Sequence, residues 1–577
     1  MSQKPPKAST KSVFSLLGAY KGRVVFLAAA TIIGNGLGLL IPKLISKGID
    51  TYTLGQVIPQ SLYIQFALIS FAVFAFYYAQ GIFQTYLSEK AGYDLRERLV
   101  GKISEMSYQG IEKETPSKLL TNLTSDMDAI KNFLSFGVVM LISSIIVIIG
   151  SAGFLLAINW KLALAVLALL PAIGVMFFLV FKQLGPLFKK TQDIIDGFNL
   201  IISQNIIGAG IVRVLNSGKE EYTKFEDKNN TAKDNSMKIL KLFAIVVPMI
   251  GGIANLASLV ILALGGHYVI QGSMSIGDFT AFNGYVFILI FPIIMLGFVS
   301  SIISQAQASY DRVHEILALP PEKEKGTVNK ELKGAIDLKN ISLVFGEKTV
   351  LKDISLSFKP GTKNAILGPT AGGKTQLLNL LIGLIPPTEG KILFDGVPLE
   401  EYSKEALHSQ VAFVFQDSVM FNLSVGENIA FSTTANQVEI EKAIETAELG
   451  DFVRTLPKGL DTSVSERGTS LSGGQKQRIM LARALALNPK VLFLDDFTAR
   501  VDHSTEKKIL ANVEKNYPGI TLVSVTQKVQ SVEHFDQIIL LMEGEVVVQG
   551  THKELLETSP EYVQIMESQK STQTYEK

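Results

Sequence analysis

Six apolar segments, each long enough to cross a lipid bilayer, fall within the N-terminal half of this 577-residue chain. A bilayer core of about 30 Å needs about 20 apolar residues in helical form. The segments are Val24–Ile45, Leu62–Leu87, Phe133–Ile158, Leu162–Phe181, Leu242–Val269 and Phe279–Ile303. Buried core helices are the alternative, but six such lengths in one chain favour membrane spans. The pattern therefore predicts an α-helical membrane domain of six transmembrane helices.

The charges between the segments predict an orientation. Loops after the second and fourth segments are rich in basic residues, including Arg96, Arg98, Lys102, Lys189, Lys190 and Arg213. The opposite segments, Ser46–Gln60 and Ile270–Gly277, carry almost none. Because basic loops stay in the cytoplasm, both termini are expected there. Met1–Ser12 is polar and basic, and the stretch that follows lacks a small-residue cleavage site before a long apolar span, so no cleaved signal peptide is expected. The amphipathic Val13–Tyr20 is expected to lie along the inner interface.

Polar groups inside the spans carry little charge. They are Asn35, Gln65, Tyr77, Tyr78, Gln80, Gln84, Asn255, Asn283 and Tyr285. Such groups either line a cavity or bond a neighbouring helix. Because no buried ionic site is visible, the pattern favours a hydrophobic or amphipathic small-molecule cargo. A net charge of +1 without a long basic tract gives nucleic-acid binding no support, and the absence of cysteine excludes disulfides and thiolate chemistry.

Three ordered motifs dominate the second half of the chain. The first follows the buried strand Ala365–Leu367 and fits G-x-x-x-x-G-K-[ST], whose backbone N–H groups cradle phosphates. It comprises Gly368, Pro369, Thr370, Ala371, Gly372, Gly373, Lys374 and Thr375. The second is Leu471 followed by Ser472, Gly473, Gly474 and Gln475. The third is the apolar strand Val491–Leu494, which ends in Asp495 and Asp496. Strands alternating with helices around these motifs predict an α/β nucleotide-binding domain.

With these motifs in this order, the chain resembles an exporter-type ATP-binding-cassette (ABC) half-transporter, with one membrane domain and one cassette. The resemblance covers nearly the whole chain. The second motif, Leu471–Gln475, is the family's signature, and Thr462–Gly468 resembles the exporter-specific stretch before it. We expect a membrane domain at 1–320, a linker at 321–334 and a cassette at 335–577. The resemblance also implies coupling helices at Thr115–Asp126 and Asn205–Leu215, for which a solvated surface helix is the alternative.

Residue roles follow from chemistry and from the resemblance. Lys374 is expected to reach the β/γ-phosphates of ATP, and Thr375, Gln416 and Asp495 to hold Mg²⁺. Phe345 matches the family's adenine-stacking aromatic, with a core phenylalanine as the alternative. The remaining cofactor-binding residues are the first motif from Gly368 to Gln376 and the signature from Ser472 to Gln475, which in this family binds ATP held by a second cassette.

Four features depart from the family pattern. Asp496 stands where a general-base Glu is usual, one methylene shorter, and Gln527 stands where the switch histidine is usual. The D-loop reads Ala499-Arg500-Val501-Asp502 rather than S-A-L-D, and Ala371 replaces a P-loop glycine. A weakened hydrolytic step beside an intact signature resembles the degenerate-site subunit of a heterodimeric multidrug exporter, and an ordinary homodimer is the alternative.

The sequence thus predicts a subunit of an ATP-hydrolysing exporter in a bacterial cytoplasmic membrane, paired with a second half-transporter. Its own ATP site is expected to be slow or non-hydrolytic. Siderophore-type uptake on an exporter fold and an ATP-using membrane regulator stay open as alternatives, whereas the six spans exclude a soluble ABC ATPase. The substrate and the partner are not readable from the residues.

Overall fold

The computed structural model describes residues 12–320, 326–431, 435–464 and 471–575, and the chain divides into two compact units. The first unit extends to Pro320 but omits Met106–Lys113, which belongs to the second unit together with the chain from Pro321 onward. Three predicted segments fall partly outside the described residues: the N-terminal stretch (1–11), the linker (321–325) and the exporter-specific stretch (465–468).

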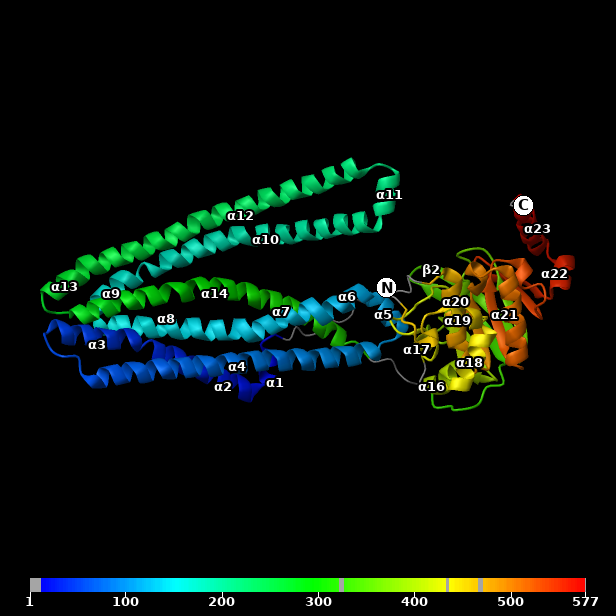
Figure 1. Ribbon diagram of the computed structural model, residues 1–577, viewed down its shortest axis with the longest axis horizontal. Coiled ribbons are helices and arrows are strands. Elements are labelled where there is room, and N and C mark those ends of the chain that lie inside the picture. The colour runs from blue at the N-terminus through cyan, green and yellow to red at the C-terminus, as the bar shows by residue number, and fades with distance from the viewer. Residues whose placement is uncertain (1–11, 321–325, 432–434, 465–470, 576–577) are drawn as a thin grey trace. The chain divides into compact units, whose positions relative to one another are not determined.

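The first unit consists of helices. They are α1 (Ser15–Ala19), α2 (Lys21–Gly38), α3 (Ile41–Thr53), α4 (Gln60–Ser104), α6 (Pro116–Thr121), α7 (Met127–Asn132), α8 (Val138–Ile158), α9 (Trp160–Leu167), α10 (Leu170–Ile207), α11 (Ala209–Val214), α12 (Gly218–Val260), α13 (Gly266–Ile270) and α14 (Ile276–Leu317). Short π-helical turns, η1 (Asn122–Asp126), η2 (Phe133–Gly137) and η3 (Ile261–Gly265), interrupt the longer ones. In Figure 1, α8 runs beside α14, and α10 runs beside α12 with α11 joining their ends.

Five helical segments among the described residues are long and apolar enough to cross a membrane. They are Lys21–Thr53, Gln60–Ser104, Pro116–Ile158, Gly218–Ile270 and Ile276–Leu317, and they contain five of the six predicted spans. The remaining predicted span, Leu162–Phe181, falls on α9 and the start of α10, where the side chains of several residues lie outside the described set. The predicted fold class, a helical membrane domain joined to an α/β domain, is confirmed.

Polar groups inside the helices bond neighbouring helices. The Asn35 Oδ1 atom accepts hydrogen bonds from the Tyr77 hydroxyl at 3.2 Å and the Ser143 hydroxyl at 3.0 Å, which ties α2 to α4 and α8. The Tyr285 hydroxyl of α14 donates to the Leu39 carbonyl at 2.7 Å. That carbonyl lies between α2 and α3, where the helix is interrupted just before Pro42. The proline ring has no N–H with which to continue the helical hydrogen bonds. For Asn35, Tyr77 and Tyr285, the structure therefore favours helix bonding over a cavity.

The start of α14 is fixed by charged groups of α3. The Asp50 carboxylate accepts from the Gly277 N–H and the Ser275 hydroxyl, each at 2.7 Å. The Lys43 ammonium lies 2.6 Å from Asp278 Oδ1. Carboxylates suit a helix N-terminus because unpaired N–H groups and the helix dipole meet there. These contacts join α3 to α14 at the end of the unit that Ser46–Gln60 and Ile270–Gly277 occupy.

The first predicted coupling position, Thr115–Asp126, forms α6 and the η1 turn inside the first unit. The segment Met106–Lys113, which carries most of α5 (Tyr108–Glu114), is assigned to the second unit. The coupling role of Thr115–Asp126 stays a prediction. The second predicted position, Asn205–Leu215, contains α11, whose flanks expose Ile207 and Leu215.

The second unit contains two sheets. One is antiparallel with strand order β2-β1-β4-β5, and the other has the order β10-β9-β3-β8-β7-β6 and is parallel from β9 to β6. The strands are β1 (Ile336–Phe345), β2 (Lys348–Phe358), β3 (Lys363–Leu367), β4 (Glu389–Phe394), β5 (Val397–Pro398), β6 (Val411–Val414), β7 (Val491–Asp495), β8 (Thr521–Thr526), β9 (Gln537–Met542) and β10 (Glu545–Gly550).

Nine helices from α15 onward belong to this unit among the described residues. They are α15 (Lys374–Leu381), α16 (Lys404–His408), α17 (Val425–Ile429), α18 (Gln437–Thr446), α19 (Gly450–Thr455), α20 (Gly473–Leu485), α21 (His503–Asn516), α22 (His552–Thr558) and α23 (Pro560–Tyr575). Of these helices, α15 begins at Lys374, within the first motif, and ends at Leu381.

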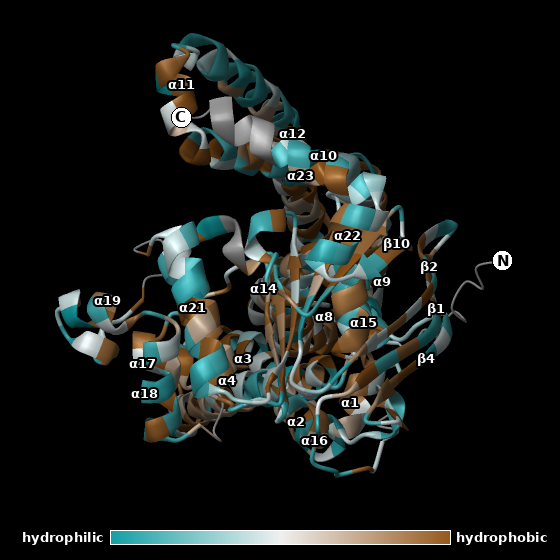
Figure 2. Cartoon of the chain, turned by 90° about the vertical axis from the view of Figure 1, so that its right-hand side faces the viewer, coloured by the Kyte–Doolittle hydropathy of each residue, from teal (hydrophilic) through white to brown (hydrophobic). Residues whose placement is uncertain are grey.

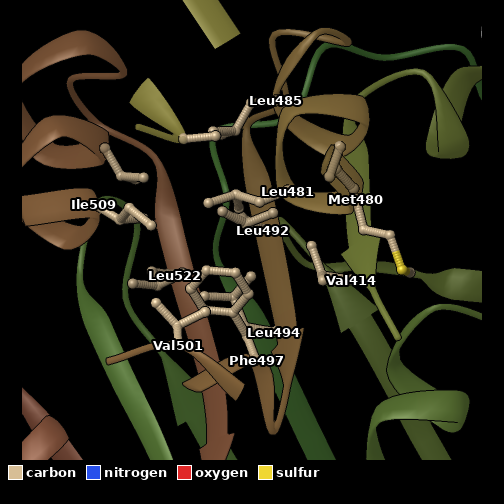
Figure 3. Close-up of a cluster of buried hydrophobic side chains, with 14 of the residues drawn as sticks. Val414, Met480, Leu481, Leu485, Leu492, Leu494, Phe497, Val501, Ile509 and Leu522 are labelled. Carbon is tan, nitrogen blue, oxygen red and sulfur yellow. The ribbon is translucent and has the colours of Figure 1, made fainter. Parts of the chain in front are cut away.

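Alternate residues of each central strand enter two different cores. Leu492 and Leu494 of β7 join a cluster with α20 and α21, while Val491 and Phe493 join a cluster on the opposite face with α15 and the antiparallel sheet. Figure 3 shows the first cluster, with Leu494 close to Phe497. In Figure 2 the central strands are largely brown, hydrophobic, and α22 is largely teal, hydrophilic. A strand buried on both faces needs an unbroken apolar run, which is what β7 has.

Candidate nucleotide-binding site

A pocket of about 260 Å³ lies at the carboxyl ends of adjacent parallel strands in the second unit. Its lining is Val350, Thr370, Ala371, Gly372, Gly373, Lys374, Thr375, Gln376, Gln416, Asp495, Asp496, Val525 and Gln527. The first motif follows β3, Gln416 follows β6, the two aspartates end β7, and Gln527 follows β8. Open parallel sheets place ligand sites at this edge. Residues up to 177 positions apart in sequence (350 to 527) line the pocket.

Tight backbone packing shapes the first motif. A Cβ atom on Gly368 would lie 2.0 Å from the Leu541 carbonyl oxygen, so only glycine fits there. Gly373 precedes α15 with φ of +93°, and Ala371 also adopts a left-handed φ, +64°. For alanine this conformation costs about 1–2 kcal/mol, which glycine would avoid. The family's usual glycine at position 371 is therefore explained by the backbone, and its replacement leaves the loop strained.

The predicted phosphate and metal ligands lie together. The Lys374 ammonium donates to the carbonyl oxygens of Gly368 at 2.9 Å and Pro369 at 2.6 Å. Burial lowers the pKa of Lys374, and the charges of Asp496 and Asp495 oppose that shift. Burial likewise raises the pKa of Asp495, whose carboxylate accepts a hydrogen bond from the Thr375 side chain. A carboxylate beside a hydroxyl is a donor set that suits Mg²⁺.

No cluster of three or more His, Cys, Asp or Glu side chains that could hold a metal occurs in the described part of the chain. A Mg²⁺ ion held by Thr375, Gln416 and Asp495 would therefore take its other ligands from water or from phosphate oxygens. That is the usual arrangement for Mg²⁺ in phosphate-binding sites, because this ion retains several waters and needs few protein carboxylates. The residues present thus fit a nucleotide-bound Mg²⁺ rather than a protein-caged one.

Asp496 and Gln527 line the same pocket. Asp496 has φ of +46°, a left-handed conformation, and its N–H donates to the Val525 carbonyl of β8 at 3.0 Å. This bond fixes the backbone at the end of β7, so the shorter aspartate side chain cannot be offset by a free backbone shift. Gln527 is exposed at the end of β8, where its side chain borders the pocket.

The signature lies apart from this pocket's lining. Ser472 begins α20 and forms a capping box, in which the Gln475 N–H donates to Ser472 Oγ at 3.3 Å and the Ser472 N–H donates to Gln475 Oε1 at 2.8 Å. The predicted phosphate-binding Gln475 side chain thus caps its own helix. Ser472 keeps a hydroxyl hydrogen, and the N–H groups of Gly473 and Gly474 begin the helix, an arrangement that suits an anion.

The altered D-loop packs on the signature glycines. A Cβ on Gly473 would lie 3.2 Å from Arg500 Cδ, and one on Gly474 would lie 2.9 Å from the Arg500 carbonyl oxygen. Phe497 and Val501, both buried, anchor the loop to the core on either side (Figure 3). Phe345, predicted to stack on adenine, ends β1, is 41% exposed and does not line the pocket. Such exposure argues against the core-phenylalanine alternative.

Three residues near the site were missed by sequence reasoning. Val350 lines the pocket from β2. Gln477 of α20, 1% exposed, donates from Nε2 to the Gln416 carbonyl at 3.1 Å. This bond links the helix that the signature begins to the loop that carries Gln416. Gln569 of α23 bonds the backbone at Gln527 and Val529. Only the apolar character of Val350 was readable; the two glutamines act through contacts between distant segments and have no local motif.

The fold and the pocket together define a P-loop nucleotide-binding domain joined to a helical membrane domain. Family models agree: residues 24–293 match the ABC transporter transmembrane region, and residues 351–499 match the ABC transporter domain. An uncharacterized ABC transporter ATP-binding protein of Bacillus subtilis (strain 168), YfiB, is 33% identical over 92% of this chain and 93% of its own length.

Other relatives carry functional names. A probable multidrug resistance ABC transporter ATP-binding/permease protein of the same organism, YheI, is 30% identical over 97% of this chain and 98% of its own length. An ATP-dependent lipid A-core flippase of Paraburkholderia xenovorans (strain LB400) is 30% identical over 83% of this chain and 81% of its own length. A solved bacterial Atm1-family ABC exporter with ATP bound shares the fold, with a TM-score of 0.79 at 23% identity, covering 95% of this chain and 98% of that one.

The chain belongs to the ABC transporter family, and its fold is that of the exporters. It is a multi-pass membrane protein whose ABC domain marks it as an ATP-hydrolysing transporter. The family predicted from the motifs is confirmed.

Proposed function

We propose that this chain is one subunit of a heterodimeric exporter that moves hydrophobic or amphipathic compounds, drugs or lipids, out through a bacterial cytoplasmic membrane. Its pocket binds Mg·ATP but hydrolyses it slowly or not at all. Its signature completes the productive ATP site on the P-loop of a second half-transporter. The basic loops after the second and fourth spans favour an orientation with both termini in the cytoplasm.

The pairing of Asp496 with Gln527 in one pocket carries this proposal. Both groups stand where hydrolysis needs a base and a phosphate sensor, and both are weaker versions of the usual residues. An aspartate places its carboxylate about 1 Å short of a glutamate, and such a misplacement can cost about a hundredfold in rate. The backbone bond from Asp496 to Val525 keeps the loop from compensating. Phosphate- and Mg²⁺-binding groups are meanwhile all present in the pocket.

Mg·ATP binding is supported by the chemistry of the lining. Lys374 supplies a cation, Thr375 and Asp495 supply oxygen ligands, Gln416 borders the same space, and the loop N–H groups can bind phosphate oxygens. Bound Mg²⁺ would neutralise charge on the transferring phosphate. Phe345, exposed at the end of β1, is available to stack on a base.

The signature is not among the residues that line this chain's own pocket, which supports a role for it at the ATP site of a second cassette. Ser472 and the glycines that follow form a capped helix N-terminus, whose N–H groups suit an anion. In the proposed assembly this end faces the γ-phosphate of ATP on the partner. The names of relatives, a multidrug transporter and a lipid flippase, support an amphipathic cargo for this chain.

Co-purification tests the pairing. The full chain expressed with its genomic neighbours is expected to bring down a distinct half-transporter, and the pair should hydrolyse ATP much faster than this chain alone. Rapid ATP hydrolysis by a purified homodimer of this chain would contradict the heterodimer proposal. Substrate flux in inverted vesicles containing the pair distinguishes an exporter from a membrane-bound regulator, which would hydrolyse ATP without moving cargo.

A further inference from the structure

The C-terminal helix contacts the loop that carries Gln527. The Nε2 atom of Gln569 on α23 donates to the Gln527 carbonyl at 2.6 Å, and its Oε1 atom accepts from the Val529 N–H at 3.0 Å. A carboxamide is the side chain that offers a donor and an acceptor side by side. The Gln569 carboxamide therefore bonds the Gln527 C=O and the Val529 N–H, and so holds the loop on both sides of Lys528.

The helix is anchored independently of this contact. Tyr562 is fully buried, and its hydroxyl lies 2.6 Å from His552 Nδ1. Ile565 and Met566 pack against the core cluster that contains Val529. Positions 562, 565, 566 and 569 share one helical face, so Gln569 is the polar end of an apolar stripe. Because the apolar stripe already anchors α23, the Gln569 carboxamide is not needed to anchor the helix. Its two hydrogen bonds act on the loop instead.

The loop in turn sets where Gln527 points. Gln527 is exposed and borders the nucleotide pocket, while its neighbours Thr526 and Val529 are buried. The Lys528 N–H donates to Thr526 Oγ1 at 3.1 Å, so the Gln569 bonds and this bond together fix the backbone on either side of Gln527. An uncharged amide senses phosphate only through a directed N–H bond, and direction depends on the backbone that carries it.

We propose that Gln569 is a positioning residue for nucleotide sensing: through the Gln527 and Val529 backbone it orients the Gln527 amide toward the terminal phosphate of a nucleoside triphosphate. The C-terminal helix is thereby a functional part of the ATP site. This inference rests on the proposed Mg·ATP site at Lys374 and on the switch role of Gln527. Its observable consequence is the preference for ATP over ADP, because only ATP carries the γ-phosphate that Gln527 would contact.

The test uses the purified full-length chain and measures Kd values for Mg·ATP and Mg·ADP together with the thermal midpoint. Variants are Gln569→Ala, Gln569→Glu, Gln527→Ala and the Gln527→Ala/Gln569→Ala double variant. Gln564→Ala is the matched control, a glutamine on the same helix that is exposed and has no hydrogen-bond partner in the described part of the chain. Lys374→Ala reports on the nucleotide site itself.

Gln527→Ala and Gln569→Ala should each lower the ATP-over-ADP preference by a similar factor, about two- to tenfold for one directed hydrogen bond. Gln569→Glu should be at least as damaging, since it turns the donor that faces the Gln527 carbonyl into an acceptor. In the double variant the second substitution should add nothing, because Gln569 acts only through Gln527. Gln564→Ala should leave the ATP-over-ADP preference unchanged. Across the variants, the thermal midpoint should not fall in step with the loss of this preference.

Three results overturn the inference. One is an unchanged preference in Gln569→Ala while Gln527→Ala loses it. Another is a Gln569→Ala loss that persists in the Gln527→Ala background, which would make Gln569 a structural residue. The third is an unchanged preference in Gln527→Ala although Lys374→Ala weakens binding, which removes the switch role but leaves the ATP site. Unchanged binding in Lys374→Ala would instead overturn the proposed function itself.

Discussion

Replacing Ser472 by aspartate isolates the role of the signature from the stability of its helix. Ser472 Oγ accepts from the Gln475 N–H and so caps α20. Aspartate and asparagine cap helices about as well as serine, within a few tenths of a kcal/mol. Ser472→Asp therefore keeps the helix but adds a negative charge, and Ser472→Asn keeps the helix without the charge. A substitution at Gly474 is less informative, because any side chain there would meet the Arg500 carbonyl at 2.9 Å.

The size of the effect follows from Coulomb's law. If the signature faces the γ-phosphate of a partner's ATP, the new carboxylate meets it at about 5 Å. With an effective dielectric constant of about 20, one pair of unit charges at that distance repels by about 3 kcal/mol. That energy corresponds to a loss of about a hundredfold in the closed, ATP-bound assembly. Ser472→Asn should lose far less, since only one neutral hydrogen bond changes.

The assay is steady-state ATP hydrolysis by the assembled transporter, with thermal unfolding as a control for helix integrity. Expected is a severe loss of kcat/KM in Ser472→Asp, a mild one in Ser472→Asn and equal unfolding midpoints. Equal activity of the two variants would refute the reasoning, because a signature that faces no phosphate has no reason to distinguish their charges.

Three further predictions concern the chain's own pocket. Lys374→Ala should weaken Mg·ATP binding about ten- to a hundredfold, the worth of a charge-assisted hydrogen bond, and calorimetry that finds an unchanged Kd contradicts the assignment. Asp496→Asn should leave most ATPase activity of the assembled pair, whereas Glu→Gln at the partner's base should abolish it; the reverse order would place the working site on this chain. Burial lowers the pKa of Lys374 in the nucleotide-free chain below 10.5, and bound phosphates favour its charged form. Mg·ATP affinity should therefore fall as pH rises through that lowered pKa, and binding in this range should take up protons. Lys374→Arg, which stays charged, should flatten this alkaline limb in calorimetric titrations.

Sequence alone determined the features that depend on local chemistry. Apolar length predicted the spans, because the bilayer imposes a fixed thickness on any segment that crosses it. The first motif predicted a phosphate cradle, because its glycines and lysine form the site within eight consecutive residues. The structure places Lys374 and Thr375, which begin α15, in the same pocket as Asp495, which ends β7.

Boundaries and long-range contacts were decided by the tertiary structure. Met106–Lys113 belongs to the second unit although the sequence places it within the membrane half, because unit membership depends on long-range contacts that helical periodicity does not encode. The sequence shows only that Ala371 replaces a glycine, whereas the backbone shows that the replacement is strained, because Ala371 adopts a left-handed φ. Gln475 stays a predicted ATP-binding residue, and the tertiary structure adds that its side chain caps its own helix.

Gln569 marks the limit most clearly. Its bond to the Gln527 carbonyl joins residues 42 positions apart, and no motif surrounds it. A phosphate-binding loop is readable because its ligand dictates consecutive residues, whereas a glutamine that binds backbone can be supplied by any element that passes within reach. The sequence therefore determined that this chain spans a membrane and contains an ATP-binding cassette, and the packing of α23 against the end of β8 decided which distant side chain holds the switch loop.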